Sequence, residues 1–212
     1  MRYAKDHKQK TRAAILETAA RRFREKGYRA SGVDDVMGAA GLTAGGFYAH
    51  FDSKSSLLSE ALRLSLASGR ERLFSGLQDL EGAEWLGAVV GRYLSRSHRD
   101  DPGTGCPLPA LAGEVSREGA LPRKALEEYL RGLVAQIAAR TPASPGLAPE
   151  DRVLATVALM TGALMLSRAV EDRPFSDRIL SAARRFAVPE SVAPSASNED
   201  PGKPKRRTRG RA

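Results

Sequence analysis

The amino-acid sequence predicts an all-helical protein, on three observations. Aromatic residues make up only 6% of the 212 residues, and the helix-favouring residues Ala, Leu, Arg and Glu are abundant. No window combines alternating apolar residues with the β-branched enrichment of a strand. The 42% content of hydrophobic residues is enough for a proper core, in one large or two small domains.

A basic first helix is predicted over residues 8–26, because apolar residues such as Phe23 recur there at helical spacing. Gly27 ends this helix. A shorter helix over residues 33–40 follows. Gly41 ends it, since glycine adopts the left-handed conformation needed there without a Cβ penalty.

A tight turn and a third helix come next. Thr43 can cap this helix by accepting hydrogen bonds from its free backbone amides, and Gly45 and Gly46 leave its start with almost no side-chain bulk. Phe47 and Phe51, four residues apart, share the face that packs against the other helices. The sequence therefore predicts a helix-turn-helix unit whose open end another molecule can approach closely.

Polar groups beside this unit are of the kinds that meet phosphate oxygens. Tyr48 and His50 project away from the buried face. Ser53 caps the next helix, and Lys54 lies in its first turn, where the helix dipole disfavours a cation unless an anion lies nearby. A bound phosphate would supply that anion.

Most of the excess of positive over negative charge lies in the two ends of the chain. The formal net charge is +9, with 11 Lys and Arg against 6 Asp and Glu in residues 1–54, 17 against 16 in residues 55–188, and 6 against 3 in residues 189–212. This is the distribution of a nucleic-acid binder with a separate regulatory body. The last segment is a predicted disordered tail, which either adds phosphate contacts or is simply solvated.

Residues 8–58 resemble the DNA-binding domain of the TetR family of transcriptional regulators, whose pattern ends in Thr/Ser-x-Gly-x-x-Tyr-x-His-Phe-x-Ser-Lys. The resemblance implies a three-helix DNA-binding domain over residues 1–54 and a helical bundle over residues 55–188 that binds ligands and dimerises. Ala44 and Gly46 are smaller than the residues that the family often has at these positions, which leaves fewer side chains to read bases.

The predicted DNA contacts divide by side-chain type. The groups expected on the phosphate backbone are Tyr48, His50, Lys54 and the Thr43 hydroxyl. The residues expected on the bases are Thr43, Ala44, Gly45 and Gly46. Base reading then depends also on DNA shape and on residues outside this helix, such as Arg12, Ser31 or the basic arm before Thr11.

The rest of the chain predicts further amphipathic helices. Their expected ranges are 53–73, 85–94, 107–117, 122–137, 150–170 and 175–188. His98, with Asp100 and Asp101, falls in a predicted loop. The helix over residues 150–170 is apolar on more than one face, and its apolar run of about 15 residues is too short to span a bilayer. In the TetR family such late helices form the dimer interface.

Several central residues are candidates for a sensor or a ligand pocket. Cys106 lies at a helix start, where a thiolate is favoured and the thiol pKa falls, which suits a redox or electrophile sensor. The alternative is a small apolar packing residue. Large side chains that either line a ligand cavity or belong to the core are Trp85, Tyr93, Tyr129, Met160 and Met165.

Together these features predict a homodimeric transcriptional repressor that binds a palindromic operator in double-stranded DNA and is released by a small-molecule or thiol-reactive inducer. The alternative is an inducer-independent architectural DNA-binding protein. An enzyme is disfavoured because the sequence has neither a metal-ligand cluster nor a Gly-rich phosphate loop, so no metal and no cofactor are predicted. One cysteine and the lack of a signal peptide predict a cytoplasmic protein that does not span a membrane.

Overall fold

The computed structural model describes residues 2–141 and 146–188, and every element of secondary structure in these residues is a helix. The elements are α1 (Arg2–Lys26), α2 (Val33–Ala39), the 3₁₀ helix η1 (Ala44–Ala49), α3 (Lys54–Phe74), α4 (Gly82–Tyr93), α5 (Arg96–Asp100), α6 (Leu108–Val115), α7 (Ala120–Ala138), α8 (Pro149–Ala169) and α9 (Arg173–Ala187). The all-helical prediction is confirmed. The predicted tail, residues 189–212, lies outside the described residues.

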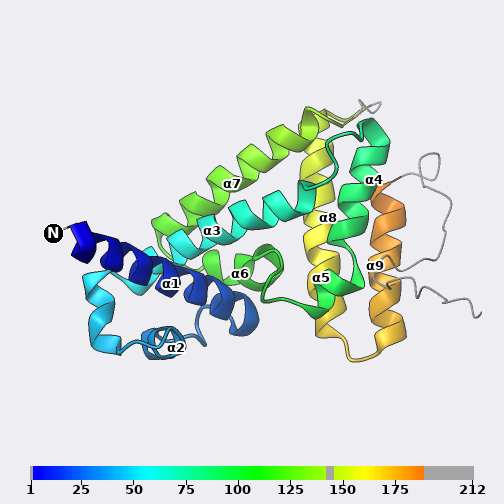
Figure 1. Ribbon diagram of the computed structural model, residues 1–212. Coiled ribbons are helices and arrows are strands. Elements are labelled where there is room, and N and C mark those ends of the chain that lie inside the picture. The colour runs from blue at the N-terminus through cyan, green and yellow to red at the C-terminus, as the bar shows by residue number, and fades with distance from the viewer. Residues whose placement is uncertain (1, 142–145, 189–212) are drawn as a thin grey trace, which may run out of the picture.

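The helices gather at two ends of the molecule. In Figure 1, α1 and α2 lie at one end, whereas α4, α8 and α9 run side by side at the other. The long helices α3 and α7 pack against each other and connect the two ends. A helix-turn-helix unit and a helical body therefore share one continuous helix, α3.

The helix-turn-helix unit has a small core of its own. Phe23 from α1, Met37 from α2 and Phe47 from η1 are almost wholly buried, and Leu57 and Leu58 of α3 close this core. Burial of side chains of this size stabilises a fold by about 1.5–3 kcal/mol each. The predicted division at residue 54 assigns α3 to the second domain, although the first turns of α3 complete the core of the first.

Glycines and one serine set the ends of these helices as the sequence predicts. Gly27 and Gly41 have φ angles of 88° and 73°, in the left-handed region. The N–H of Leu42 then donates to the Met37 carbonyl at 2.9 Å and closes the turn. Ser53 caps α3 by accepting the N–H of Ser56 at 3.0 Å.

Two local predictions are wrong. The element after the turn, η1, is a 3₁₀ helix, and no hydrogen bond from the Thr43 side chain caps it. The adjacent Gly45 and Gly46 weaken the preference for an α-helix there. The segment around His98, predicted as a loop, forms the short helix α5, in which Ser95 accepts the N–H of His98 at 3.2 Å.

The outer side of α8 and α9 carries apolar residues that the described part of the chain leaves uncovered. We call this surface the outer α8–α9 face; its exposed residues are Leu154, Ala155, Ala158, Met165, Leu166, Phe175 and Phe186. Among the described residues, α8 is the one helix long and apolar enough to cross a membrane by length and composition, and 33% of its most apolar window is buried. Its bounds, Pro149–Ala169, agree within one residue with the helix predicted over residues 150–170.

Candidate DNA interface and ligand cavity

The turn and η1 present small and polar groups to solvent. Thr43, Gly45 and Tyr48 are exposed, and Tyr48 has 74% of its surface accessible. Beneath them Phe47 is fully buried and stacks on Phe51, with ring centroids 5.8 Å apart. The packing of the inner face therefore fixes which side chains of this segment point outward.

Arg12 is held within the protein beside this surface. It donates to both carboxylate oxygens of Glu60, at 2.7 and 2.6 Å, and to the His50 carbonyl at 3.3 Å, and its guanidinium lies 4.5 Å from the centre of the Phe51 ring. This bidentate ion pair joins α1 to α3. Arg12 therefore has a structural role, and the base reading considered from the sequence stays a prediction. The Nδ1 atom of His50 is buried, without a hydrogen-bond partner among the described residues.

Lys54 and Ser31 also have partners inside the protein. The Lys54 ammonium donates to the Tyr28 carbonyl at 2.7 Å and lies 4.2 Å from the centre of the Tyr28 ring. These contacts balance the cation at the start of α3 within the protein itself, and the predicted contact of Lys54 with a DNA phosphate stays a prediction. Partial burial lowers the pKa of Lys54. Ser31 is fully buried and donates to the Gly27 carbonyl at 2.8 Å, which excludes it from direct base contact.

A cavity of about 290 Å³ lies in the body, between α3, α4, α7, α8 and the connection from α5 to α6. Its volume is close to the lower end of the range for small-molecule sites. Predicted pocket residues that line it are Tyr93, Cys106, Tyr129 and Met160. Trp85 is instead a fully buried core residue beside Phe74, with ring centroids 5.3 Å apart. Met165 is half exposed on the outer α8–α9 face.

His98 holds the wall of this cavity in place. Its Nδ1 lies 2.7 Å from the Tyr93 carbonyl, and its Nε2 accepts the N–H of Cys106 at 2.9 Å. Because a carbonyl only accepts, the hydrogen is on Nδ1, Nε2 is unprotonated and the ring is neutral. Gly105 lies against this ring so closely that a Cβ atom there would be 2.8 Å from it.

The neutral His98 makes the stability of the protein depend on pH. Burial lowers the pKa of His98 from its ordinary value of 6.5. Below pH 6.5 this histidine binds a proton in the unfolded chain but stays neutral in the folded chain, so the free energy of unfolding falls on acidification. Well above pH 6.5 the histidine is neutral in both states, so its contribution to the free energy of unfolding is constant. We expect Tm to fall between about pH 7.5 and about pH 5.5, and to fall less in a His98→Gln variant, by scanning calorimetry. Equal pH dependence of the two proteins would contradict this assignment. Asp100, whose pKa its bond to Arg99 lowers to about 2, does not titrate in this window.

Burial raises the pKa of the Cys106 thiol, which contradicts the lowered pKa predicted from its position. The apolar surroundings outweigh the dipole of α6, a helix of only 8 residues. The hydroxyl of Tyr93 is buried nearby and makes no hydrogen bond within the described residues, although Cys106 and Thr161 lie close enough to influence its pKa, which burial raises.

Hydrogen bonds tie the surroundings of the cavity to the helix-turn-helix unit. Arg24 of α1 donates to the carbonyl of Gly103, at 2.8 Å from its Nε, in the connection that also lines the cavity. Glu114 of α6 accepts the N–H of Tyr28 at 3.1 Å and the N–H of Arg29 at 2.7 Å, just after α1 ends. These contacts therefore join the connection to α1, and α6 to the segment just after α1.

Sequence reasoning missed Glu114 and Arg99. Arg99 of α5 is buried and donates to Ser176 at 2.8 Å and to Asp177 at 2.7 Å, both on α9. These partners on other elements lie 77 to 86 positions away in the chain, beyond the reach of periodicity. The one available signal was an acidic residue, Glu114, within an otherwise apolar short helix.

Residues 15–61 match the family model described as bacterial regulatory proteins, tetR family. The match runs from α1 through the turn into α3, which is the segment that folds as the helix-turn-helix unit. This segment is therefore similar to the DNA-binding domain of the TetR family. This is a family of transcriptional regulators and not of enzymes.

The curated relatives that this chain matches are regulators. It is 38% identical over 91 residues to the HTH-type transcriptional repressor KstR2 of Rhodococcus jostii, an alignment that covers 41% of this chain and 45% of that protein. A second alignment, 29% identical over 171 residues, covers 76% of this chain and 86% of the uncharacterized HTH-type transcriptional regulator MT0206 of Mycobacterium tuberculosis. The chain spans about half the length, or less, of the first curated relatives that it matches.

Solved structures extend the likeness to the helical body. A TetR transcriptional regulator from Chloroflexus aurantiacus superposes with a TM-score of 0.68 at 27% identity, over 85% of this chain and 96% of that chain. Both parts of the chain, the helix-turn-helix unit and the body with its cavity, therefore have the fold of a TetR-family regulator.

Proposed function

We propose that the protein is a homodimeric transcriptional repressor, which binds a palindromic operator in the cytoplasm and leaves it when an effector occupies the cavity. The proposal rests above all on one observation. The connection that borders the cavity is hydrogen-bonded to Arg24 of α1, the first helix of the helix-turn-helix unit, and Glu114 of α6 is hydrogen-bonded to Tyr28 and Arg29, just after α1. An effector that changes the cavity wall can therefore change the placement of that unit.

The DNA contacts of the proposal come from the exposed end of the helix-turn-helix unit. Base contacts are assigned to Thr43, Ala44, Gly45 and Gly46, and backbone contacts to Tyr48, His50 and Lys54. The exposure of Thr43, Gly45 and Tyr48 supports this assignment most directly. In a dimer the two units occupy successive major grooves, about 34–36 Å apart.

Dimerisation is assigned to the outer α8–α9 face. Ala155, Ala158 and the neighbouring Gly162 are small, which lets a second helix approach α8 closely. A face with large exposed apolar residues such as Phe186, 83% exposed, is unfavourable in water and is covered in a dimer. A two-fold symmetric pair matches the symmetry of a palindrome.

Two kinds of signal fit the cavity. A small molecule can occupy it, since both apolar and polar side chains line it. A thiol-reactive compound acting on Cys106 is the second candidate, because this residue lines the same cavity. The raised pKa of the buried thiol favours the first, since the thiolate is the reactive form.

Selection of genomic fragments followed by footprinting tests the proposal. We expect protection of one or a few palindromic sites, and a Gly45→Glu variant should bind them at least about tenfold more weakly, because its carboxylate faces phosphates. Gly132→Glu is the matched control, since Gly132 on α7 is exposed and an added Cβ meets nothing within 4 Å, as at Gly45.

Two results would contradict the proposal. Uniform coating of DNA without a preferred site would favour the architectural alternative. Unchanged affinity of the Gly45→Glu variant would place the DNA interface elsewhere on the molecule.

A further inference from the structure

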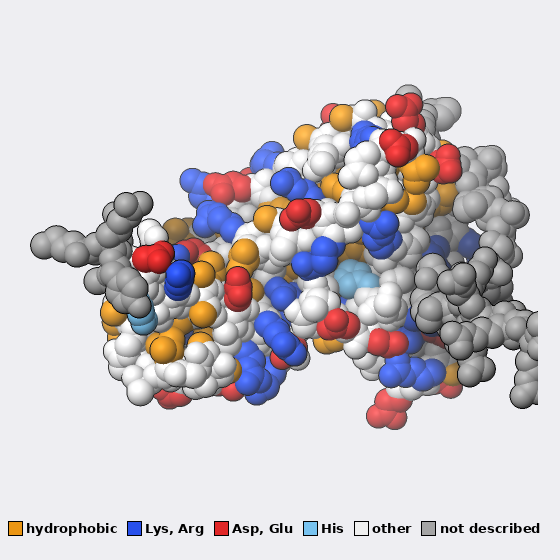
Figure 2. All heavy atoms as spheres, viewed as in Figure 1, with side chains coloured by type: hydrophobic (Ala, Val, Ile, Leu, Met, Phe, Trp, Pro, Cys, Tyr) orange, Lys and Arg blue, Asp and Glu red, His pale blue; other side chains and the backbone are white. Residues whose placement is uncertain are grey.

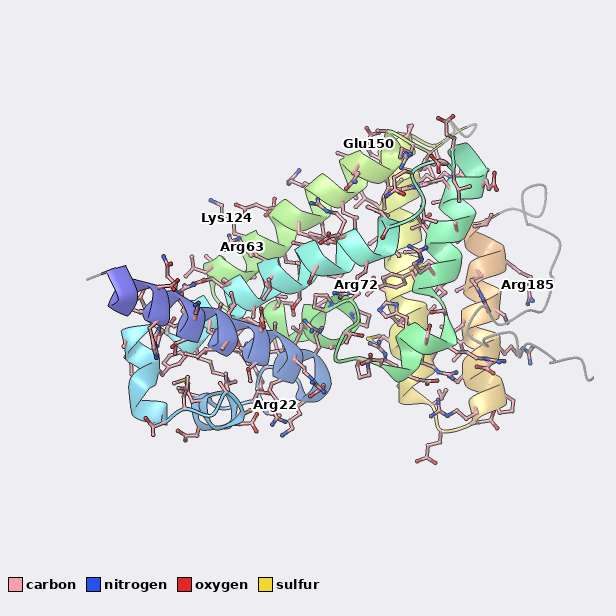
Figure 3. The ribbon with its side chains drawn as sticks, viewed as in Figure 1. Arg22, Arg63, Arg72, Lys124, Glu150 and Arg185 are labelled. Carbon is pink, nitrogen blue, oxygen red and sulfur yellow. The ribbon has the colours of Figure 1, made fainter. Side chains whose placement is uncertain are left out.

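The charged side chains that line the cavity are mainly positive. Arg70 and Arg72 from the last turns of α3 and Arg92 from α4 line it, and Asp101 is the one carboxylate among its described lining residues. Figure 2 shows Lys and Arg side chains gathered around the middle of this face. Figure 3 places Arg72 beside the connection between α5 and α6, at the centre of the molecule.

No carboxylate in the described part of the chain pairs with these guanidinium groups. Arg72 donates to the Thr104 carbonyl, and Arg92 donates to three backbone carbonyls at the end of α3. Arg70 has neither a hydrogen bond nor an ion pair with a described residue. The Asp101 carboxylate is occupied by Thr104, whose hydroxyl donates at 2.7 Å and whose N–H donates at 3.3 Å. Arg70, Arg72 and Arg92 are exposed and outnumber the single carboxylate of Asp101, so this wall has a net positive charge that can attract an anion from solution.

Arg70 and two further arginines, Arg24 and Arg168, act on the inner wall of the cavity. Burial raises the pKa of Cys106 and of Tyr129, while nearby Arg side chains oppose the rise by favouring a negative charge. Arg24 and Arg168 act in this way on Cys106, and Arg70 acts on Tyr129. An acidic group in the cavity would meet the same attraction.

The interior of the cavity suits an apolar body with one hydrogen-bonding atom. Leu133, Val157 and Met160 line it, and none of them carries a hydrogen-bonding group. Tyr93 also lines it, is 5% exposed, and has a buried hydroxyl without a hydrogen bond from any described residue. An accepting ligand atom would satisfy this hydroxyl.

We infer that the cavity binds an organic anion, a compound with an apolar body and a carboxylate or similar acidic group that pairs with Arg70 and Arg72. The inference rests on the proposed function, because it names the chemical class of the effector. A cation would meet like charges at this wall. A neutral compound would leave the guanidinium groups without a counter-charge.

Calorimetric titration of the purified full chain with three compounds that share one body tests the inference. The probes are phenylbutyrate, phenylbutanol and phenylbutylamine. We expect phenylbutyrate to bind at least about tenfold more tightly than phenylbutanol, and phenylbutylamine to bind most weakly. Equal affinity for the acid and the alcohol, a preference for the amine, or no binding of any probe would overturn the inference.

Substitutions test whether the carboxylate of the ligand pairs with Arg70. Arg70→Gln should weaken phenylbutyrate binding by about five- to tenfold and leave phenylbutanol binding unchanged. Arg63→Gln is the matched control, because Arg63 lies on the same helix but pairs with Glu128 of α7 at 3.3 Å and does not line the cavity. Loss of the acid preference in the control and not in Arg70→Gln would overturn the assignment.

Gly69→Leu tests whether the probes enter the cavity. Gly69 lines it, and an added Cβ meets no atom within 4 Å. Leu is also favourable inside a helix, so the variant should fold, bind DNA normally and bind phenylbutyrate at least about tenfold more weakly. Unchanged binding would place the acid outside the cavity and overturn the inference. If the acid binds as expected but leaves operator affinity unaltered, the ligand class stands and effector-driven release is wrong.

Discussion

An Ala158→Glu variant is expected to be a monomer that binds the operator at least about a hundredfold more weakly than the parent protein. Ala158 lies in the middle of α8 on the outer α8–α9 face and is exposed within its own chain, so the substitution leaves the fold of that chain intact. In a two-fold dimer the new carboxylate would be buried close to its symmetric copy, and burying unpaired like charges costs several kcal/mol. A monomer then holds only one half of the palindrome.

Light scattering after gel filtration measures the oligomeric state, and fluorescence anisotropy with the selected operator measures affinity. Ala67→Glu is the matched control, since Ala67 is exposed on α3, away from the outer α8–α9 face. The control should remain a dimer with full affinity. A dimeric Ala158→Glu variant would place the interface on another surface, and a monomeric parent without preference for a palindrome would end the proposal of a homodimeric repressor.

A Glu114→Gln variant is expected to bind both the operator and the effector while losing most of the effector-induced release. Glu114 accepts the backbone N–H groups of Tyr28 and Arg29, so its carboxylate joins α6 to the end of α1. A hydrogen bond to a charged group contributes about 1.5–3 kcal/mol, and the neutral amide forfeits much of it. Coupling between two sites is limited to the free energy carried by such contacts. The drop in operator affinity at saturating effector should shrink at least about fivefold.

Glu118→Gln separates charge from hydrogen bonding. Glu118 lies near Tyr28 and Lys54 and influences their pKa values, but no described backbone N–H donates to it. It should therefore release DNA as the parent does. Normal release by Glu114→Gln would show that the signal passes through another contact, of which Arg24 to Gly103 is the next to substitute.

The helix-turn-helix unit could be predicted because its signals are local. Gly27, Gly41 and Ser53 act within four residues of their own positions, and the structure gives each the expected conformation or cap. Arg12 and Lys54 could not be placed in this way, since their partners are 48 and 26 positions distant. Local patterns in the sequence do not show which distant residues contact Arg12 and Lys54 in the fold.

The helices of the body could be predicted from the sequence, but the residues that line its cavity could not. Periodicity assigns a side chain to the inner face of a helix, and that face includes both core and cavity. Trp85 and Tyr93 therefore looked alike, although only Tyr93 lines the cavity. The direction predicted for the pKa shift of Cys106 was wrong for a related reason, because desolvation depends on neighbours from several helices.

The hydrogen bond between Arg24 and Gly103 affects the effector concentration at which the proposed repressor responds. Free-energy coupling works in both directions, so whatever factor the effector removes from operator affinity, the operator removes from effector affinity. Protein molecules bound to DNA then respond only at a higher effector concentration than protein molecules in free solution. The threshold at which transcription begins should accordingly shift with the number of operator sites in the cell, and a titration of the isolated protein would place it too low.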